Sequence, residues 1–370
     1  MILTSLNLKN FRIHSDLNLT FSAGLNYIIG GNGIGKTSVL ESIYYLCTTK
    51  SCVSRSDQEA LRFEEDQFLV EGKFFDLTKN TVRVTFNRID NKKQFYMNEK
   101  LISKASSVIG QFPVVTLLPS DHSITQGAPS DRRKFFDSIL SQANPNYLET
   151  LLEYNRVLKQ RAALLAILKE SYNNLHHDEL NAWTEKLVEK GADIINYRIS
   201  FTNKFKAYVA ESYKRIMGID EIPEIHYLYF DNEKSENIAE RLHEFLKKRK
   251  EEEIKRTSNL VGPHRDDYEF LLGDRSLKTY GSQGQHKTFQ TVLKFAEFFY
   301  LKDVSGKTPI FLLDDVFGEL DSKRASKISE YLGDVGQAII TLTDFGNFAF
   351  LKTGEGDNVI NLKEKAAAYA

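Results

Sequence analysis

Short runs of alternating apolar and polar residues fill the first third of the chain. Such alternation puts every second side chain on one face, so it predicts β-strands. The predicted strands are Ile2–Leu8, Leu17–Phe21, Phe68–Phe74, Thr81–Asn87, Gln94–Asn98 and Val114–Leu118. From about Ser130 the apolar residues recur at helical spacing instead, which predicts a change from sheet to helix there.

The helical part is long, and mixed structure returns after it. The predicted helices are Arg132–Gln142, Tyr147–Lys169 and Asp178–Met217. The last of these would extend roughly 60 Å if unbroken, at about 1.5 Å per residue. A strand at Ile225–Phe230 and a charged helix at Glu236–Arg256 come next, and strands and helices alternate again from Tyr268. We therefore predict a β-rich α/β domain interrupted by a mainly helical insertion.

A glycine-rich loop stands between a short apolar strand, Tyr27–Ile29, and a helical pattern. Its residues are Gly30, Gly31, Asn32, Gly33, Ile34, Gly35, Lys36, Thr37 and Ser38. This spacing is that of a Walker A loop, in which glycines let consecutive N–H groups face one phosphate at a helix N-terminus. A glycine-rich helix cap is the alternative, but it leaves the adjacent Lys36 and Thr37 unexplained.

The residue types of this loop suit ATP and Mg²⁺. Lys36 supplies a cation for the β- and γ-phosphates and is predicted to act in catalysis, and the Thr37 hydroxyl is a ligand for Mg²⁺. We therefore predict that the whole loop, from Gly30 to Ser38, binds ATP.

A second segment supplies the carboxylates that such a site requires. Ile310–Leu313 is a continuous apolar run, as expected of a central parallel strand, and Asp314 and Asp315 stand at its carboxyl end. Asp314 is predicted to bind Mg²⁺ through a water molecule, and Asp315 to orient or deprotonate the attacking water. Alone, the segment has a simpler alternative, a strand that ends in an acidic turn.

Between these motifs, Ser282, Gly284 and Gln285 open an amphipathic helix. They resemble the signature motif of ABC-type ATPases, in which a helix N-terminus contacts the γ-phosphate held by another subunit. The alternative is an ordinary helix cap.

The order of these motifs, with the later segment Gly318–Asp321, looks like the head domain of SMC and Rad50 ATPases, and most closely like the RecF family. Four further stretches resemble that family: Leu8–His14, Val115–Asp137, Leu158–Leu165 and Val261–Phe270. The resemblance runs from about residue 1 to 362 and adds Asp321 to the nucleotide site. The insertion is too short for an SMC coiled coil and holds no cysteine for a zinc hook.

The resemblance implies an ABC-type α/β head, with a mixed sheet around the phosphate loop, interrupted by a helical arm. Its two halves are expected at residues 1–125 and 258–362, the arm at 126–257, and a disordered tail at 363–370.

Two features depart from the wider ABC pattern. Asp315 stands where many ABC ATPases have Glu, which shortens the reach to water and predicts slow turnover. Thr343 and Asp344 occupy the switch position where transporter cassettes carry His, so the γ-phosphate sensor is unassigned. Neither Gln111 nor Gln126 fits the position of the Q-loop glutamine.

Charge and cysteine usage limit the possible partners and compartment. Lys and Arg total 49 against 50 Asp and Glu, so any DNA surface is local. The candidates for DNA or partner contacts are Arg12, Arg132, Arg133 and Arg265, each with an internal ion pair as its alternative. The run Lys247–Lys250 is followed by three glutamates and is interpreted as a solvated helix face. Two cysteines and no long apolar run predict a cytoplasmic protein without a membrane segment.

The family resemblance also implies a function. It predicts an ATP-dependent DNA-binding protein of recombinational repair, replication restart and the SOS response, associated with the nucleoid. This protein would dimerise around two ATPs on gapped duplex or junction DNA and hydrolyse ATP slowly in a DNA-dependent way. It would help RecR to load RecA. The alternatives are the ATPase subunit of a transporter and a nuclease-coupled relative of RecF.

Overall fold

The computed structural model describes residues 1–54, 56–170, 174–218, 222–230, 237–319, 321–344 and 354–363. The chain forms two compact units. Unit 1 comprises residues 1–121, 211–220 and 288–370, and unit 2 comprises residues 122–210 and 221–287. Apart from Lys363, the predicted disordered tail lies outside the described residues.

Unit 1 contains an antiparallel sheet with the strand order β2-β1-β4-β5-β6-β7. Its strands are β1 (Ile2–Phe11), β2 (His14–Thr20), β4 (Gln67–Phe75), β5 (Lys79–Asn87), β6 (Lys92–Met97) and β7 (Lys100–Leu101). Buried and exposed positions alternate along β4 and β5, because one face of the sheet covers a core and the other faces solvent. The first five strands predicted from alternation are therefore confirmed.

A parallel sheet completes unit 1, with the order β14-β3-β13-β12-β8. Its strands are β3 (Leu25–Ile29), β8 (Val114–Leu117), β12 (Ile310–Asp314), β13 (Ala338–Leu342) and β14 (Asn358–Asn361). Every residue of β12 and β13 is buried, as expected of central strands covered on both faces. The sixth predicted strand, Val114–Leu118, is confirmed, but it belongs to this sheet.

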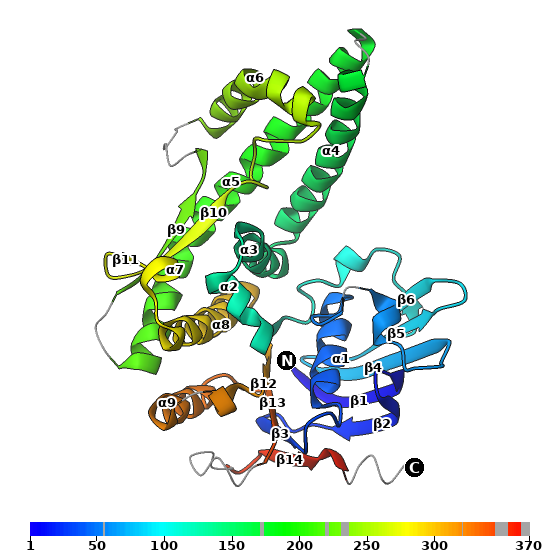
Figure 1. Ribbon diagram of the computed structural model, residues 1–370. Helices are drawn as coiled ribbons and strands as arrows, with labels where there is room; N and C mark the ends of the chain where they lie inside the picture. Colours follow the sequence, from blue (N-terminus) through cyan, green and yellow to red (C-terminus); the bar gives the residue numbers. More distant parts are fainter. Residues whose placement is uncertain are drawn as a thin grey trace. The chain divides into compact units, whose positions relative to one another are not determined.

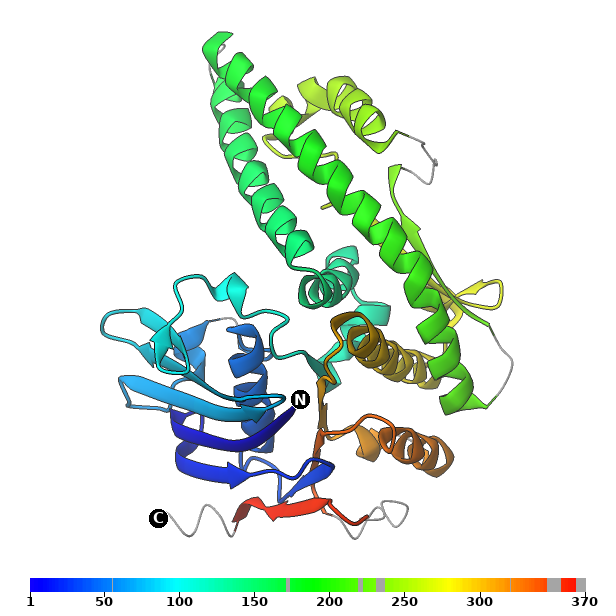
Figure 2. The same cartoon turned by 180° about the vertical axis from the view of Figure 1, so that it is seen from behind.

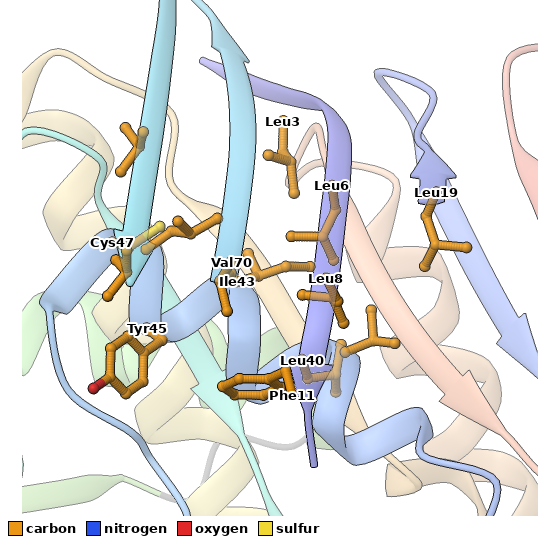
Figure 3. Close-up of a cluster of buried hydrophobic side chains, with 14 of the residues drawn as sticks. Leu3, Leu6, Leu8, Phe11, Leu19, Leu40, Ile43, Tyr45, Cys47 and Val70 are labelled. Carbon is orange, nitrogen blue, oxygen red and sulfur yellow. The ribbon is translucent and has the colours of Figure 1, made fainter. Parts of the chain in front are cut away.

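Helix α1 (Lys36–Thr48) lies between the two sheets (Figures 1 and 2). Its side chains Leu40 and Ile43 are fully buried and share one apolar cluster with β1, β4, β12 and β13. Figure 3 shows Leu40 and Ile43 beside Leu8 and Val70 of the antiparallel sheet. Because both sheets pack on α1, the loop that precedes the helix is held at a fixed place.

Two further helices cover the other face of the parallel sheet: most of α8 (Gln283–Ser305), and α9 (Ser322–Leu332). Phe295 of α8 contacts Phe311 of β12 edge-on, with ring centroids 5.1 Å apart, and stacks on Tyr331 of α9 at 4.5 Å. Strand β12 is thus enclosed by aliphatic residues on one face and aromatic rings on the other.

The described part of the chain also contains short 3-10 helices: η1 (Asp57–Ala60), η2 (Ala105–Ser107), η3 (Pro119–Asp121) and η5 (Val316–Glu319).

Unit 2 is mainly helical. Its helices are α2 (His122–Gln126), α3 (Pro129–Ala143), α4 (Pro145–Glu170), α6 (Ile238–Arg256), α7 (Leu277–Tyr280) and the larger part of α5 (Asn174–Met217). The predicted helices of the insertion are confirmed. The residue that begins the predicted charged helix, Glu236, lies outside the described residues.

Unit 2 also holds a three-stranded sheet with the order β11-β10-β9. Its strands are β9 (Pro223–Leu228), β10 (Asp267–Leu272) and β11 (Arg275–Ser276). The predicted boundary at residue 258 separates β9 from β10, whereas the two strands pair along six residues each. An alternating pattern identifies a strand but not the strand with which it pairs. The domain boundaries at 126 and 258 therefore stay predictions.

The interior of unit 2 contains paired charges. Arg161 donates to Glu253 at 2.7 Å and to Asn259 at 2.8 Å, and the side chains of Arg161 and Glu253 are 1% and 0% exposed. Arg198 donates to Asp137 at 2.8 Å. Removing one partner of such a pair leaves a buried charge uncompensated, at a cost of about 3–5 kcal/mol. These pairs therefore fix the helices of unit 2 to one another in one arrangement.

Candidate nucleotide site

The backbone of the loop that precedes α1 requires glycine at two positions. Gly33 and Gly35 have φ values of 79° and 92°, in the left-handed region that other residues rarely adopt. At Gly35 a Cβ atom would also lie 2.4 Å from Nε2 of His14. That nitrogen is 3.1 Å from the Gly35 carbonyl oxygen, so the start of β2 holds the loop in place.

Lys36 closes the loop through its side chain. Its Nζ donates to the carbonyl oxygens of Gly30 at 2.6 Å and Gly31 at 2.9 Å. Burial lowers the pKa of Lys36, and the carboxylates of Asp315 and Asp314 partly offset this effect. Lys36 is 8% exposed as a residue, so phosphate oxygens would be favourable acceptors for its charge.

Asp314 joins the two motifs that the sequence analysis identified. The Thr37 hydroxyl donates to its Oδ2 at 2.8 Å, and the Thr341 hydroxyl donates to its Oδ1 at 2.7 Å. Thr37 and Asp314 are 277 positions apart in sequence. The fold therefore brings the loop and the acidic strand end together at the carboxyl ends of β3, β12 and β13.

Asp315 follows with an unusual backbone conformation. Its φ is 49°, in the left-handed region where Asp and Asn occur more often than other side chains. Its N–H donates to the Thr341 hydroxyl at 3.0 Å. Thr341 thus contacts both acids. Its sequence signal is weak, a single hydroxyl residue near the end of a continuous apolar strand, and it was not among the predicted site residues.

The oxygen donors of this corner fit a magnesium ion. Mg²⁺ prefers carboxylate, hydroxyl and phosphate oxygens, and Thr37 and Asp314 present a hydroxyl and a carboxylate side by side. At the predicted switch position, Thr343 and Asp344 directly follow β13, and Phe345 lies outside the described residues.

Ser282 and Gln285 form a reciprocal helix cap within unit 2. The Ser282 N–H donates to Oε1 of Gln285 at 2.9 Å, and the Gln285 N–H donates to Oγ of Ser282 at 3.3 Å. This is a capping box, the ordinary use of Ser and Gln at a helix N-terminus. Asp321 likewise caps α9 by accepting from the Arg324 N–H at 3.0 Å. The predicted roles of Ser282, Gly284, Gln285 and Asp321 toward nucleotide stay predictions.

All four candidate arginines make polar contacts within the protein. Arg12 pairs with Glu41 at 2.8 Å, and Arg133 donates to the Asp266 carbonyl oxygen at 2.6 Å. Arg132 makes two bonds to Asp267, and its side chain is 3% exposed. For Arg132 the structure shows the internal ion pair that was the alternative to a DNA contact. Arg265 is exposed, and its Nε and Nη2 donate to the Asn259 carbonyl oxygen. The predicted roles of all four in contacting DNA or a partner stay predictions.

The chain resembles several known proteins along nearly its whole length. A family model described as an AAA domain matches residues 5–283. The DNA replication and repair protein RecF of Chloroherpeton thalassium is 41% identical over 361 residues, covering 95% of this chain and 97% of the relative. RecF of Chlorobium phaeobacteroides is 37% identical, covering 98% and 99%.

The chain is also similar to solved structures of RecF. The recombination mediator protein RecF-ATP of the RecFOR pathway matches with a TM-score of 0.87 at 31% identity, covering 97% of this chain and 95% of that chain. An Smc head bound to a domain of ScpA has a TM-score of 0.55 at 13% identity, covering 95% and 92%, and so shares the fold alone.

The two sheets around α1, the glycine-rich loop and the acidic end of β12 define an ATPase head of the ABC type, with the fold of the SMC class. Within that class, the chain belongs to the RecF family of DNA replication and repair proteins. Across the part of the chain that the structure describes, none of the helices has the length and apolar character needed to span a membrane.

Replacing Lys36 with Ala is expected to weaken ATP binding by roughly 10- to 150-fold, because it removes charge-assisted bonds of about 1.5–3 kcal/mol. Isothermal titration calorimetry measures the change. Lys9→Ala, at an exposed position of β1, is the matched control and should bind ATP normally. Equal ATP affinity of Lys36→Ala and the unchanged protein would contradict the assignment of the loop.

Proposed function

We propose that this chain is an ATP-gated DNA-binding protein whose nucleotide lies in the loop Gly30–Ser38 with Mg²⁺. The observation that carries the proposal is the contact between Thr37 and Asp314, since it brings the glycine-rich loop and a carboxylate together at one strand edge. The similarity to the RecF-ATP structure supports ATP as the nucleotide.

The chain's own groups have distinct parts in hydrolysis. Lys36 and the loop N–H groups bind the β- and γ-phosphates. Thr37 and Asp314 would hold Mg²⁺, which would supply positive charge to the phosphates when bound. Asp315 accepts a proton from water as the water oxygen bonds to the γ-phosphorus and ADP leaves. An aspartate reaches less far than a glutamate, so the hydrolysis is slow and serves as a release step.

A second copy of the chain completes the site in this proposal. Ser282, Gly284 and Gln285 contact the γ-phosphate bound to the other subunit, so two ATPs join a homodimer. Asp321 also belongs to this composite site. The dimer forms only with ATP because the γ-phosphate supplies the shared acceptor.

The DNA partner follows from the family. The relatives are DNA replication and repair proteins, and we propose gapped duplex or single-strand to double-strand junctions as the substrate. We also propose that the protein acts with RecR and helps to load RecA at gaps. It would do so in the nucleoid region of the cytoplasm. Membership of the RecF family sets aside a transporter subunit, and no observation favours coupling to a nuclease.

DNA binding is expected to depend on ATP and to weaken steeply with salt. A chain with a net charge of −1 gathers enough cationic surface only when two subunits join their local patches. The measurement is affinity for gapped duplex across a salt series with ATP, ADP or no nucleotide. Each phosphate contact should add about −0.9 to the slope of log affinity against log salt. The same affinity in all three nucleotide states would refute ATP gating.

A further inference from the structure

An open pocket of about 530 Å³ lies within unit 2, where the end of β9, helix α6 and the segment before β10 meet. Aromatic side chains line part of it: Tyr229, Phe230 and Phe245. Two arginines, Arg249 and Arg265, also line it. Its volume is within the range of small-ligand sites, and neither the nucleotide loop nor the acidic strand end contributes to it.

The aromatic rings of the pocket are held in a fixed order. Phe230 and Phe245 lie parallel, with ring centroids 5.6 Å apart and an angle of 6° between the planes. Tyr229 packs on Phe230 edge-on at 5.5 Å and stacks on Tyr227 at 5.2 Å. Tyr227 in turn stacks on the buried Tyr268 at 4.9 Å. The rings are thus anchored in the interior of unit 2, while Tyr229, Phe230 and Phe245 stay partly exposed.

Cationic groups surround the same rings. The guanidinium of Arg241 lies 4.8 Å above the Phe245 ring, and Nζ of Lys248 lies 6.0 Å from it. Arg265 uses two bonds on the Asn259 carbonyl oxygen, so three of its five N–H donors are left for other acceptors. Arg249 pairs with Glu252 at 2.9 Å, and the two side chains are 42% and 34% exposed, so a phosphate at the pocket can compete with a carboxylate that solvent already screens.

The two aspartates that line the pocket do not oppose an anion. Asp266 accepts a hydrogen bond from the Tyr227 hydroxyl and lies 3.7 Å from Nη1 of Arg198. Asp267 is bound by both Nε and Nη2 of Arg132. Their charges are therefore compensated by arginines from inside unit 2.

Parallel aromatic rings flanked by arginines fit a ligand with a planar base and a phosphate. Bases of a duplex are paired and stacked within the helix, so only an unpaired base can enter a pocket. We propose that this pocket binds one unpaired nucleotide of single-stranded DNA, with its base against Phe230 and Phe245 and its phosphate on Arg249 and Arg265. The proposal rests on the proposed function in DNA binding and places the single strand of a gap on unit 2.

The test compares three substitutions at Phe245 in the full chain with ATP. Phe245→Tyr and Phe245→Trp keep an aromatic ring, whereas Phe245→Leu keeps only an apolar side chain at this partly exposed position. The probes are an oligothymidine strand, the same strand with abasic sugars, blunt duplex DNA and free thymidine monophosphate. Fluorescence anisotropy measures binding of each strand, and the monophosphate is tested as a competitor.

Phe245→Leu is expected to bind oligothymidine about 5- to 150-fold more weakly, the factor that corresponds to one stacked base at about 1–3 kcal/mol. Phe245→Tyr should bind it normally, and all variants should bind ATP and blunt duplex equally. In Phe245→Trp, oligothymidine should change the indole emission and the abasic strand should not. Strong competition by the monophosphate would instead identify a free nucleotide as the ligand and would overturn the DNA assignment.

Equal oligothymidine binding by Phe245→Leu and Phe245→Tyr, or equal binding of the abasic strand, would refute the pocket as a base-binding site. A pocket that serves a peptide would give that result. If the unchanged chain binds gapped duplex with ATP in the salt-series measurement described above, the proposed function stands while this inference fails. If it binds no DNA in any nucleotide state, the proposed function itself fails.

Discussion

Asp315→Asn is expected to bind ATP like the unchanged protein and to hydrolyse it roughly 100- to 10,000-fold more slowly, the range typical for loss of a general base. The amide keeps the size and shape of the carboxylate but cannot accept the proton of the attacking water. Asn also tolerates left-handed backbone, so the φ of 49° at this position is preserved. Because Asn fits this position in shape and backbone conformation, slower hydrolysis by Asp315→Asn would report the lost carboxylate and not a misfolded protein.

The measurements are calorimetry for ATP binding and phosphate release for turnover. Asp334→Asn is the matched control, because Asp334 lies in the same unit and pairs with Arg215 at the surface. Its turnover should equal that of the unchanged protein. If Asp315→Asn turned over as fast as this control, the base would have to be another group.

Ser282→Arg is expected to bind ATP normally, to stay monomeric and to lose hydrolysis. The substitution puts a long side chain at the start of α8, where the proposed partner phosphate docks, while Lys36 and Thr37 are untouched. Losing one charge-assisted contact should cost about 1.5–3 kcal/mol of dimer stability per site. The added bulk acts in the same direction.

The capping box between Ser282 and Gln285 makes a control necessary, because any loss of the cap also weakens the helix by about 1 kcal/mol. Ser282→Thr keeps a capping hydroxyl and should dimerise. Ser282→Ala removes the cap without adding bulk and should lie between the two. Light scattering with ATP measures the assembly. A Ser282→Arg protein that dimerises and turns over at the normal rate would show that no composite site exists.

Much of the nucleotide site was predictable because its signals are local. The spacing from Gly30 to Thr37 and the apolar run before Asp314 each identify an element and its end, and parallel strands bring their carboxyl ends together. The contact between Thr37 and Asp314 agrees with that expectation. Thr341 was missed because a single hydroxyl in an apolar strand has no motif of its own.

The predictions that stayed open depend on contacts between distant residues. The local sequence of Arg132 does not reveal its partner, because Asp267 is 135 positions away in the chain. The pairing of β9 with β10 likewise joins residues on both sides of the predicted boundary at 258. The aromatic pocket could not be predicted from the sequence, since its rings come from separate segments of the chain. The charged run on α6 was a feature of this region that the sequence pattern indicated.

The position of β3 in the parallel sheet has a consequence for how the protein is made. This strand leads directly into the phosphate loop, yet both of its neighbours, β13 and β14, come from the last part of the chain. During synthesis, β3 therefore cannot pair with β13 until more than three hundred further residues have left the ribosome. Until then the phosphate loop has no completed sheet beside it. Such non-local pairing folds slowly and leaves strand edges exposed. We expect newly made chains to depend on chaperones, and ATP to bind only after the head is complete.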